Sequence, residues 1–266
     1  CSAFEFDDVS ALEPTEFELY YRAGEHEYRY ALSVHADEIV SEGLWRRKLR
    51  ASRTAMLFER EGTEVELGPT LRKLVTAARF NPSLPYLSFL CINFDAPVIK
   101  EAAGWFLDGV FLNYNSSYLE RMLEQLLDEA ESPEVTRFLR AVDVHIDGFR
   151  VEKSPEWRGQ RVFVRHEVDG KGYELRLSEE SAGTQKLMGL AAYLMTALER
   201  GATVVVDELD GKLHPKLLRY VILLFKDPGV NKSGAQLIFS SQDVSTMRND
   251  VFRRDEIWFA ARGEGE

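Results

Sequence analysis

The chain has 266 residues, 45% of them hydrophobic, and a formal net charge of −11. This length allows one large domain or two smaller ones, each with its own core. Two cysteines are too few for a disulfide framework, no apolar run approaches the roughly 20 residues that span a bilayer, and the start does not resemble a signal peptide. We therefore expect a cytoplasmic protein without a membrane contact. The acidic balance also argues against a surface that binds nucleic acid throughout.

Residues 1–68 have the pattern of an antiparallel sheet. Two pairs of short apolar segments each flank a turn that contains glycine, namely residues 17–21 and 28–34 around Ala23-Gly24, and residues 56–59 and 63–67 around Glu61-Gly62. Glycine adopts the positive φ that tight hairpin turns need. The pattern therefore predicts two β-hairpins.

Residues 69–141 change to helical spacing and form a predicted helical insert. Apolar residues recur three and four positions apart at Val98, Ala102, Trp105 and Phe106, and again at Leu119, Met122, Leu123, Leu126 and Leu127. A further helix is expected to start at Ser132-Pro133-Glu134, where a capping hydroxyl precedes a proline and an acid. We interpret the aromatic members of these stripes as core residues.

Residues 142–266 are expected to form the third part of an α/β fold. Strand-like patterns cover residues 142–151 and 160–177, with turns expected at Asp147-Gly148 and Asp169-Gly170. Helices and strands then alternate: helices at residues 184–200 and from Pro215, and strands at residues 202–206, 236–240 and 256–260, with Gly201 ending the first helix. This alternation predicts a mainly parallel βαβ lobe with right-handed crossovers.

Two acids, Asp207 and Glu208, follow the buried strand at residues 202–206. In α/β proteins the carboxyl ends of such strands form the edge at which ligands bind. The first acid can hold Mg²⁺ and the second can orient an attacking water, which is the equipment that phosphoryl transfer requires. An ordinary strand end with two solvated acids remains the alternative.

The segment Ser181-Ala182-Gly183-Thr184 leads directly into the helix that precedes this strand. Small residues at a helix start present backbone N–H groups and a hydroxyl, which together can bind an anion. A simple capped helix start would have the same sequence. The order of the segments favours nucleotide binding, since Asp210 and then Gln242 follow the acid pair, as in machines that sandwich ATP between two heads.

Histidines and basic residues give weaker signals. His214 precedes the proline that opens a helix, where a structural role is more common than a catalytic one, and no paired Cys or His spacing indicates zinc. One dense basic stretch is a candidate nucleic-acid contact, although a solvated face is the commoner explanation; it comprises Arg46, Arg47, Lys48, Arg50 and Arg53.

The motifs of the last third together resemble ABC-type ATPases. The specific resemblance is to the stand-alone bacterial AAA-family ATP-binding proteins related to the ATPase half of overcoming-lysogenisation-defect nucleases. The resemblance rests on residues 180–185 as the signature motif, residues 205–208 as the Walker B strand and Leu213-His214-Pro215 after it. It implies an ABC-ATPase-like head with an antiparallel β region, a helical insert and a parallel lobe.

The resemblance also implies a role for each site residue. Asp207 would coordinate Mg²⁺, and Glu208 would be the catalytic base of ATP hydrolysis. The signature residues Ser181, Ala182, Gly183 and Thr184 would bind nucleotide. Of these, Ser181 and Gly183 would contact the γ-phosphate held by the opposite protomer, so that ATP joins a homodimer or a higher oligomer. Asp210 would communicate between the two sites.

The chain departs from the family pattern in two ways. The phosphate-cradling loop G-x-x-x-x-G-K-[S/T] is absent from the sequence, so we expect it upstream of Cys1. The switch position is Gln242 instead of the usual histidine, and glutamine carries no charge.

By analogy with the family, we expect an ATP-controlled dimer that regulates a partner effector, a nuclease or toxin, in anti-phage defence. The alternatives are a nucleotide-gated or non-hydrolysing scaffold that holds the effector and, with less support, a DNA-repair ATPase head.

Overall fold

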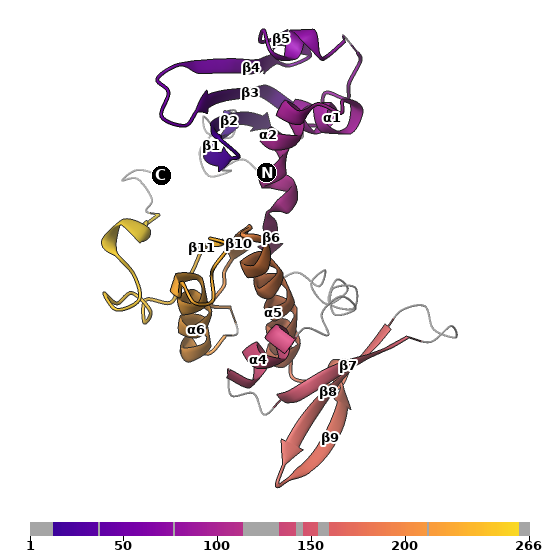
Figure 1. Ribbon diagram of the computed structural model, residues 1–266, viewed down its shortest axis with the longest axis vertical. Helices are drawn as coiled ribbons and strands as arrows, with labels where there is room; N and C mark the ends of the chain where they lie inside the picture. Colours follow the sequence, from indigo (N-terminus) through magenta and orange to yellow (C-terminus); the bar gives the residue numbers. More distant parts are fainter. Residues whose placement is uncertain are drawn as a thin grey trace. The chain divides into compact units, whose positions relative to one another are not determined.

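The computed structural model describes residues 13–36, 38–76, 78–113, 133–141, 146–153, 160–211 and 213–260. The chain divides into two compact units (Figure 1): unit 1 comprises residues 1–108 and 259–266, and unit 2 comprises residues 109–258. Each unit has its own hydrophobic core. The predicted mixed α/β class is confirmed. The predicted boundaries after residue 68 and after residue 141, which separate the β region, the helical insert and the βαβ lobe, stay a prediction. No described helix is both long and apolar enough to cross a bilayer.

Unit 1 contains one antiparallel sheet whose strands pair in chain order. The strands are β1 (Thr15–Ala23), β2 (His26–His35), β3 (Glu38–Lys48), β4 (Thr54–Glu61) and β5 (Glu64–Leu67). Both predicted hairpins are confirmed, with φ of 53° at Gly24 and 55° at Gly62. The central strand β3 was not predicted, because the basic residues at its end hide its alternation.

Helices cover the apolar face of this sheet. They are the short η2 (Leu71–Lys73), then α1 (Tyr86–Asn93) and α2 (Pro97–Asp108). The aromatic residues of α2 are partly buried and pack against the core, in line with the prediction, since the rings of Trp105 and Phe106 lie 5.3 and 5.4 Å from that of Tyr21. The helical stripe expected at residues 119–127 lies outside the described residues.

Unit 2 contains a parallel sheet of β11 (Gln236–Phe239), β10 (Thr203–Asp207) and β6 (Val110–Asn113), in that order. The expected alternation of β10, α6 (Pro215–Lys226) and β11 is confirmed, as is α5 (Ala182–Arg200). The helical prediction was wrong at β6, because three apolar residues in a short run fit either a helix or a strand.

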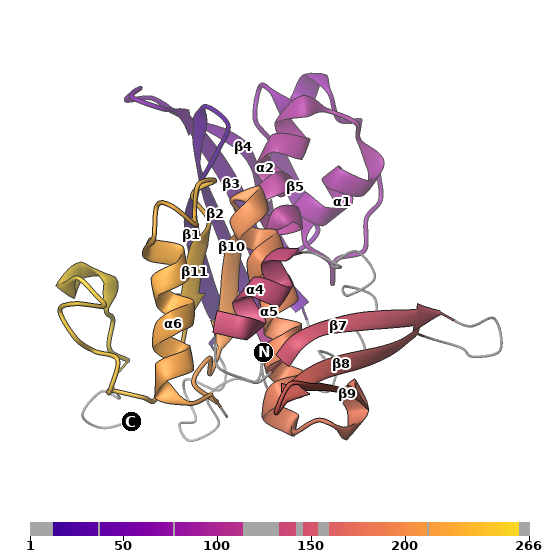
Figure 2. The ribbon, with the colours of Figure 1, turned by 60° about the horizontal axis from the view of Figure 1, so that its bottom comes forward.

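The helices α5 and α6 run beside β10 and β11 and share a core with them (Figure 2). Gly201 ends α5 in the left-handed region, as expected, with φ of 72°. Val204 and Val206 are buried on the helix side. The opposite face of the sheet is more exposed to solvent. Phe111 and Ile238, both in register with Val205, are 54% and 52% exposed.

A second, antiparallel sheet of unit 2 comprises β7 (Ile146–Lys153), β8 (Gln160–Val168) and β9 (Lys171–Arg176). The turn at Asp169-Gly170 is confirmed, with φ of 51° and 74°. The turn expected at Asp147-Gly148 is wrong, because these residues form an irregularity within β7, where the register shifts between Ile146 and Gly148. Residues 142–145 of the strand predicted there lie outside the described part.

The remaining elements of unit 2 are one helix and two short 3-10 turns. The helix α4 (Pro133–Ala141) begins at the predicted proline. The short turns are η3 (Leu177–Glu179) and η4 (Arg254–Glu256). The strand expected at residues 256–260 is wrong, because no described strand pairs with this segment and Trp258 is 90% exposed.

A buried carboxylate joins the sheet of unit 1 to α1. Glu42 of β3 accepts hydrogen bonds from the Tyr30 hydroxyl and the Leu87 N–H, both at 3.0 Å, and from the Tyr86 N–H. Tyr86 and Leu87 open α1, where free N–H groups favour a negative charge. Burial nevertheless raises the pKa of Glu42 above its ordinary value. The charge is balanced by Arg60, whose Nη1 lies 3.4 Å from Glu42 Oε2, and both side chains are 0% exposed.

Arg60 also holds the loop that precedes α1. Its guanidinium donates to the carbonyl oxygens of Gly62, Pro82 and Leu84 at 2.7, 2.5 and 2.8 Å. One side chain therefore satisfies a buried carboxylate and three backbone acceptors.

Replacing Arg60 with methionine keeps the apolar volume of the stem but leaves Glu42 buried without its cation. We expect the free energy of unfolding to fall by about 3–5 kcal/mol, as for other broken buried pairs. Urea unfolding measures this change. The control is Arg72→Met, which removes one exposed hydrogen bond to the Leu67 carbonyl and should cost no more than about 0.5 kcal/mol. Equal losses in the two variants would contradict this role of Arg60.

Candidate functional site

The carboxyl ends of β10 and β11 lie side by side in unit 2. The two strands are parallel, with Val206 in register with Phe239. Asp207 ends β10 and Ser240 follows β11, so the acid and the hydroxyl emerge at the same edge of the sheet. This edge is where the sequence placed the catalytic and metal-binding residues.

Ser240 connects the two strand ends through four hydrogen bonds. Its hydroxyl donates to Asp207 Oδ1 at 2.6 Å and accepts from the Glu208 N–H at 2.7 Å. Its own N–H donates to the Val206 carbonyl, and its carbonyl accepts from the Leu209 N–H, both at 3.1 Å. Sequence reasoning named the segment but not this residue. The sequence feature that could have indicated it is a serine directly after an apolar strand, when the neighbouring parallel strand ends in an aspartate.

Glu208 adopts an unusual backbone conformation, with φ of 50°. The left-handed region costs a residue with a side chain roughly 1–2 kcal/mol. The hydrogen bond from the Glu208 N–H to Ser240 offsets part of this cost, as does a bond of 2.9 Å from the Gly211 N–H to the Glu208 carbonyl. The turn thus reverses the chain immediately after the acid pair.

Gln242 joins the two remaining acids of the site. Its side-chain Nε2 donates to Glu208 Oε1 at 3.3 Å, and its backbone N–H donates to Asp210 Oδ2 at 3.2 Å. Asp210 Oδ1 is buried and has no hydrogen-bond partner in the part of the chain that the structure describes. Next to Gln242, the hydroxyl and the N–H of Ser245 hold the pKa of Asp243 below its ordinary value.

The chemistry of these side chains fits Mg²⁺. The described residues contain no cluster of three His, Cys, Asp or Glu side chains that could hold a metal by themselves. Mg²⁺ needs no such cluster, since it prefers oxygen ligands and takes one or two carboxylates together with water and substrate phosphates. Asp207 supplies carboxylate oxygens of this kind, whereas no described histidine or cysteine emerges at this edge to favour zinc.

The predicted signature residues lie at the start of α5. Ser181 caps the helix, because its hydroxyl accepts from the Thr184 N–H at 3.1 Å and its carbonyl accepts from the Gln185 N–H at 3.0 Å. The N–H groups of Ala182 and Gly183, in the first turn, have no partner within the helix. The predicted capped helix start is confirmed, and the first turn of such a helix offers N–H groups that can bind an anion.

His166 forms a pair with Glu180, the residue directly before the cap Ser181. His166 Nε2 of β8 lies 2.5 Å from Glu180 Oε1, and the two side chains are 17% and 9% exposed. The Gln185 side chain donates to the Glu180 carbonyl at 2.8 Å. Sequence reasoning did not associate His166 with the signature segment, and no local pattern could have done so.

The structure does not bring the signature segment and the acid site together within one chain. Among the described residues, the hydrogen bonds of Ser181 and Thr184 stay within the start of α5, and those of the Asp207 carboxylate and the Gln242 side chain stay within the acid edge. The 19 residues of α5 span about 28 Å, whereas the five residues of β10 span about 17 Å. Because β10 returns antiparallel to α5, the start of α5 extends beyond the carboxyl edge of the sheet.

Two further candidate groups have structural partners. His214 caps α6, with Nδ1 accepting from the Lys216 N–H at 3.2 Å. In the basic stretch, Arg47 is bonded to Glu27, and Lys48 Nζ lies 3.6 Å from Glu25 Oε2. These acids reduce the local positive charge, and the nucleic-acid contact stays a prediction.

One protein-family model matches most of the chain. The model described as "AAA domain, putative AbiEii toxin, Type IV TA system" matches residues 2–248. The chain belongs to this AAA-domain family. Its function class is therefore a nucleotide-binding ATPase domain, as predicted, while the defence-system branch stays a prediction. No curated protein matches the chain.

Two solved structures of Smc heads are similar to the chain. One is a head bound to the C-winged helix domain of ScpA, at 15% identity and a TM-score of 0.38, with 83% of this chain and 67% of that chain covered. The other is a head with an extended coiled coil bound to the C-terminal domain of ScpA derived from Pyrococcus furiosus. It is 13% identical, with a TM-score of 0.39, and the match covers 83% of this chain and 72% of that chain.

Replacing Ser240 with alanine tests how the acid edge is held. The Glu208 N–H and the Asp207 carboxylate both lose a partner, so we expect the free energy of unfolding to fall by about 1–3 kcal/mol. Ser240→Thr retains the hydroxyl and should lose less. Ser241→Ala is the matched control, because the hydrogen bond that the Ser241 hydroxyl accepts in the described part of the chain is local, from the Asp243 N–H. Urea unfolding that ranks Ser241→Ala as the more damaging change would contradict this role of Ser240.

Proposed function

We propose that the chain is the head of an ATPase that binds ATP with Mg²⁺, dimerises around it and hydrolyses it. The observation that carries the proposal is the hydrogen-bonded edge at which Ser240 holds both Asp207 and the backbone of Glu208. Phosphoryl transfer depends mainly on positioning and charge neutralisation. A strained turn stabilised by several hydrogen bonds suits that task, because it keeps two carboxylates in place.

Each residue of this edge has a proposed role. Asp207 would hold Mg²⁺, with the second oxygen of its carboxylate free of Ser240. Bound there, the metal would neutralise charge on the phosphates. Glu208 would accept the proton of the attacking water as a general base, and Gln242 would orient Glu208 through its side-chain hydrogen bond. The unpaired oxygen of Asp210 would accept a donor that arrives with the second head.

The signature segment would act on the nucleotide of the other head. The free N–H groups of Ala182 and Gly183, with the hydroxyls of Ser181 and Thr184, suit a γ-phosphate. The absence of described hydrogen bonds between this segment and Asp207 supports contact in trans. ATP would then lie between two copies of the chain.

We further propose that ATP-dependent dimerisation regulates an effector, a nuclease or a toxin, in anti-phage defence. The family description supports this proposal, since it names a toxin and a toxin–antitoxin system. We also propose that the protein acts in the cytoplasm. A nucleic-acid contact through Arg46, Arg50 or Arg53 would be an additional property of unit 1.

One observation favours a second function, a nucleotide-gated scaffold that holds the effector without hydrolysis. Gln242 stands at the switch position and donates to the carboxylate of Glu208 at 3.3 Å, so it occupies one acceptor site of the proposed base. Gln242 also carries no charge with which to stabilise the transition state.

Glu208→Gln in the full-length protein separates these functions. The amide is nearly isosteric but accepts no proton, so we expect ATP turnover to fall by about 10²–10⁴-fold, while ATP binding persists. The control is Glu199→Gln, an exposed change near the end of α5, which should leave turnover unchanged. Turnover that survives Glu208→Gln would remove Glu208 from the base role. ATP binding without turnover in the unmodified protein would favour the scaffold.

Ser181→Asp tests the contact in trans. Aspartate caps a helix as well as serine does, so the fold should be retained, but its charge opposes a phosphate. We expect turnover that increases with protein concentration in the unmodified protein to be lost in this variant, while each protomer still binds ATP. Simultaneous loss of ATP binding would contradict a contact in trans. Ser181→Asn, which caps without charge, should lose less turnover.

A further inference from the structure

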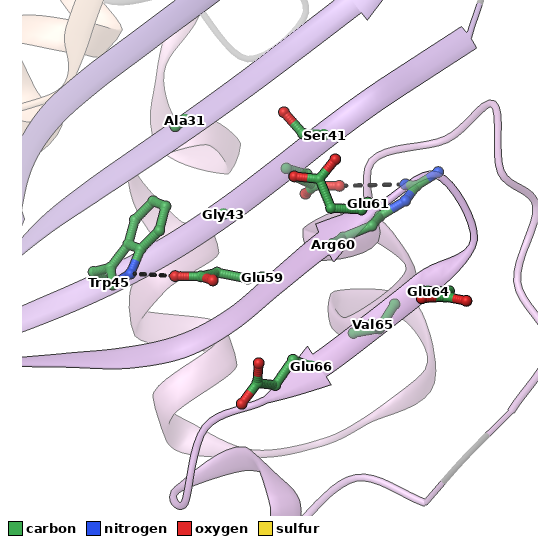
Figure 3. A pocket seen from close by; sticks show the side chains of 11 residues that line it. Ala31, Ser41, Gly43, Trp45, Glu59, Arg60, Glu61, Glu64, Val65 and Glu66 are labelled. Carbon is green, nitrogen blue, oxygen red and sulfur yellow. Dashed lines mark hydrogen bonds and ion pairs between the residues drawn. The ribbon is translucent and has the colours of Figure 1, made fainter.

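The open face of the sheet in unit 1 has a hollow of about 480 Å³ (Figure 3). Small residues form its floor, because Ala31 of β2 is in register with Gly43 of β3, and Ser41 follows in the next row. The same rows continue into larger side chains on β4 and β5. The change in side-chain size across four strands makes this part of the face concave.

An aromatic ring forms one wall of the hollow. Trp45 lies over Gly43 so closely that a Cβ at Gly43 would be 2.1 Å from the nearest ring carbon. Glycine weakens a strand interior and often marks a close approach, and here it permits the ring to lie against the sheet. The indole Nε1 donates to Glu59 Oε1 at 3.1 Å, which fixes the ring at the rim.

Four glutamates of β4 and β5 line the hollow in two rows, and one of them, Glu59, lies beside the Trp45 ring. Glu59 is directly opposite Glu66, and Glu61 is directly opposite Glu64. Like charges at such cross-strand positions destabilise a sheet. No described residue forms an ion pair with any of the four, although Glu59 accepts from Trp45. Two adjacent like-charge pairs thus oppose folding at the edge of the sheet, which local stability does not explain.

An arginine of the chain itself stacks on this ring and is paired with Glu18. The guanidinium carbon of Arg29 lies 4.7 Å from the centroid of the Trp45 ring. A guanidinium is planar, stacks on aromatic faces and binds carboxylates with two parallel hydrogen bonds, whereas an ammonium does neither. The combination of one ring and opposed carboxylates therefore selects arginine over lysine.

We propose that this hollow binds an extended, arginine-bearing segment of a partner protein. The two carboxylate rows are two residues apart along β4, or about 6.7 Å, which is also the spacing of alternate side chains in an extended segment. An Arg-X-Arg segment along β5 therefore presents one guanidinium to each row. β5 is the edge strand of the sheet, so the segment can approach without displacing another described strand. The proposal is independent of the ATPase assignment.

The test uses the full chain and three labelled peptides in fluorescence anisotropy. One peptide carries Arg-Ser-Arg between Gly-Ser flanks, the second has lysine at both positions, and the third has two serines between the arginines. We expect the first to bind most tightly. Glu61→Gln with Glu64→Gln should weaken its binding about tenfold, as expected for the loss of charge-assisted pairing.

The matched control is Glu16→Gln with Glu38→Gln, which removes the same charge from exposed positions of the same sheet. It should leave the dissociation constant within about twofold. The Glu61/Glu64 variant should also have a raised thermal midpoint, because it relieves the repulsion between opposed carboxylates. Weaker peptide binding by a more stable protein separates a binding role from damage to the fold.

Trp45→Phe tests the stacking wall, since it retains a ring but loses the bond to Glu59 and part of the stacking area. It should reduce the preference for arginine over lysine. Three results would overturn the proposal: equal binding of the arginine and lysine peptides, equal losses in the Glu61/Glu64 and control variants, or complete competition by spermine, which would indicate a surface that attracts any polycation.

Discussion

The candidate site of unit 2 depends on one hydroxyl. Ser240 bridges two parallel strand ends, and through it the carboxylate of Asp207 and the backbone of Glu208 share a single anchor. Without that anchor, the turn after β10 would have to keep a left-handed residue with little compensation. The arrangement places the strain next to the residues that would contact the phosphate, and the sheet behind them is held by backbone pairing and by the packing of α5 and α6. A rigid sheet therefore supports a locally strained edge.

Unit 1 is organised around a different electrostatic arrangement. On its covered face, one buried pair, Glu42 and Arg60, satisfies the start of α1 and the loop before it. On its open face, Glu61 and Glu64 oppose each other and form no ion pair with a described residue, although Arg60 lines the same hollow. On the buried face of this sheet, the charged side chains are paired with each other. On the face exposed to water, the opposed carboxylates are not. This contrast separates the structural role of the first pair from the binding role that we propose for the second.

The sequence predicted elements wherever periodicity and turn residues agreed. The hairpin at Gly24 and the helix that ends at Gly201 have both signals, and both are confirmed. β6 has neither a long period nor a flanking turn on both sides, and its pairing with β10 comes from residues about ninety positions away. The acid pair could be placed at the carboxyl edge from the βαβ order alone. The hydrogen bonds of Ser240 and the contact of His166 with Glu180 could not, since they depend on the register between strands.

The positive φ of Glu208 has a consequence for which residues this position tolerates. Glycine, asparagine and aspartate adopt the left-handed region at lower cost than glutamate does. Backbone preference alone therefore favours a shorter residue after Asp207, whereas the contact with Gln242 and the base role that we propose favour a longer one. The two demands oppose each other at a single residue. If only the free energy of unfolding mattered, glycine or asparagine would be preferred at this position. Glutamate therefore combines a less favourable backbone conformation with a side chain of sufficient length.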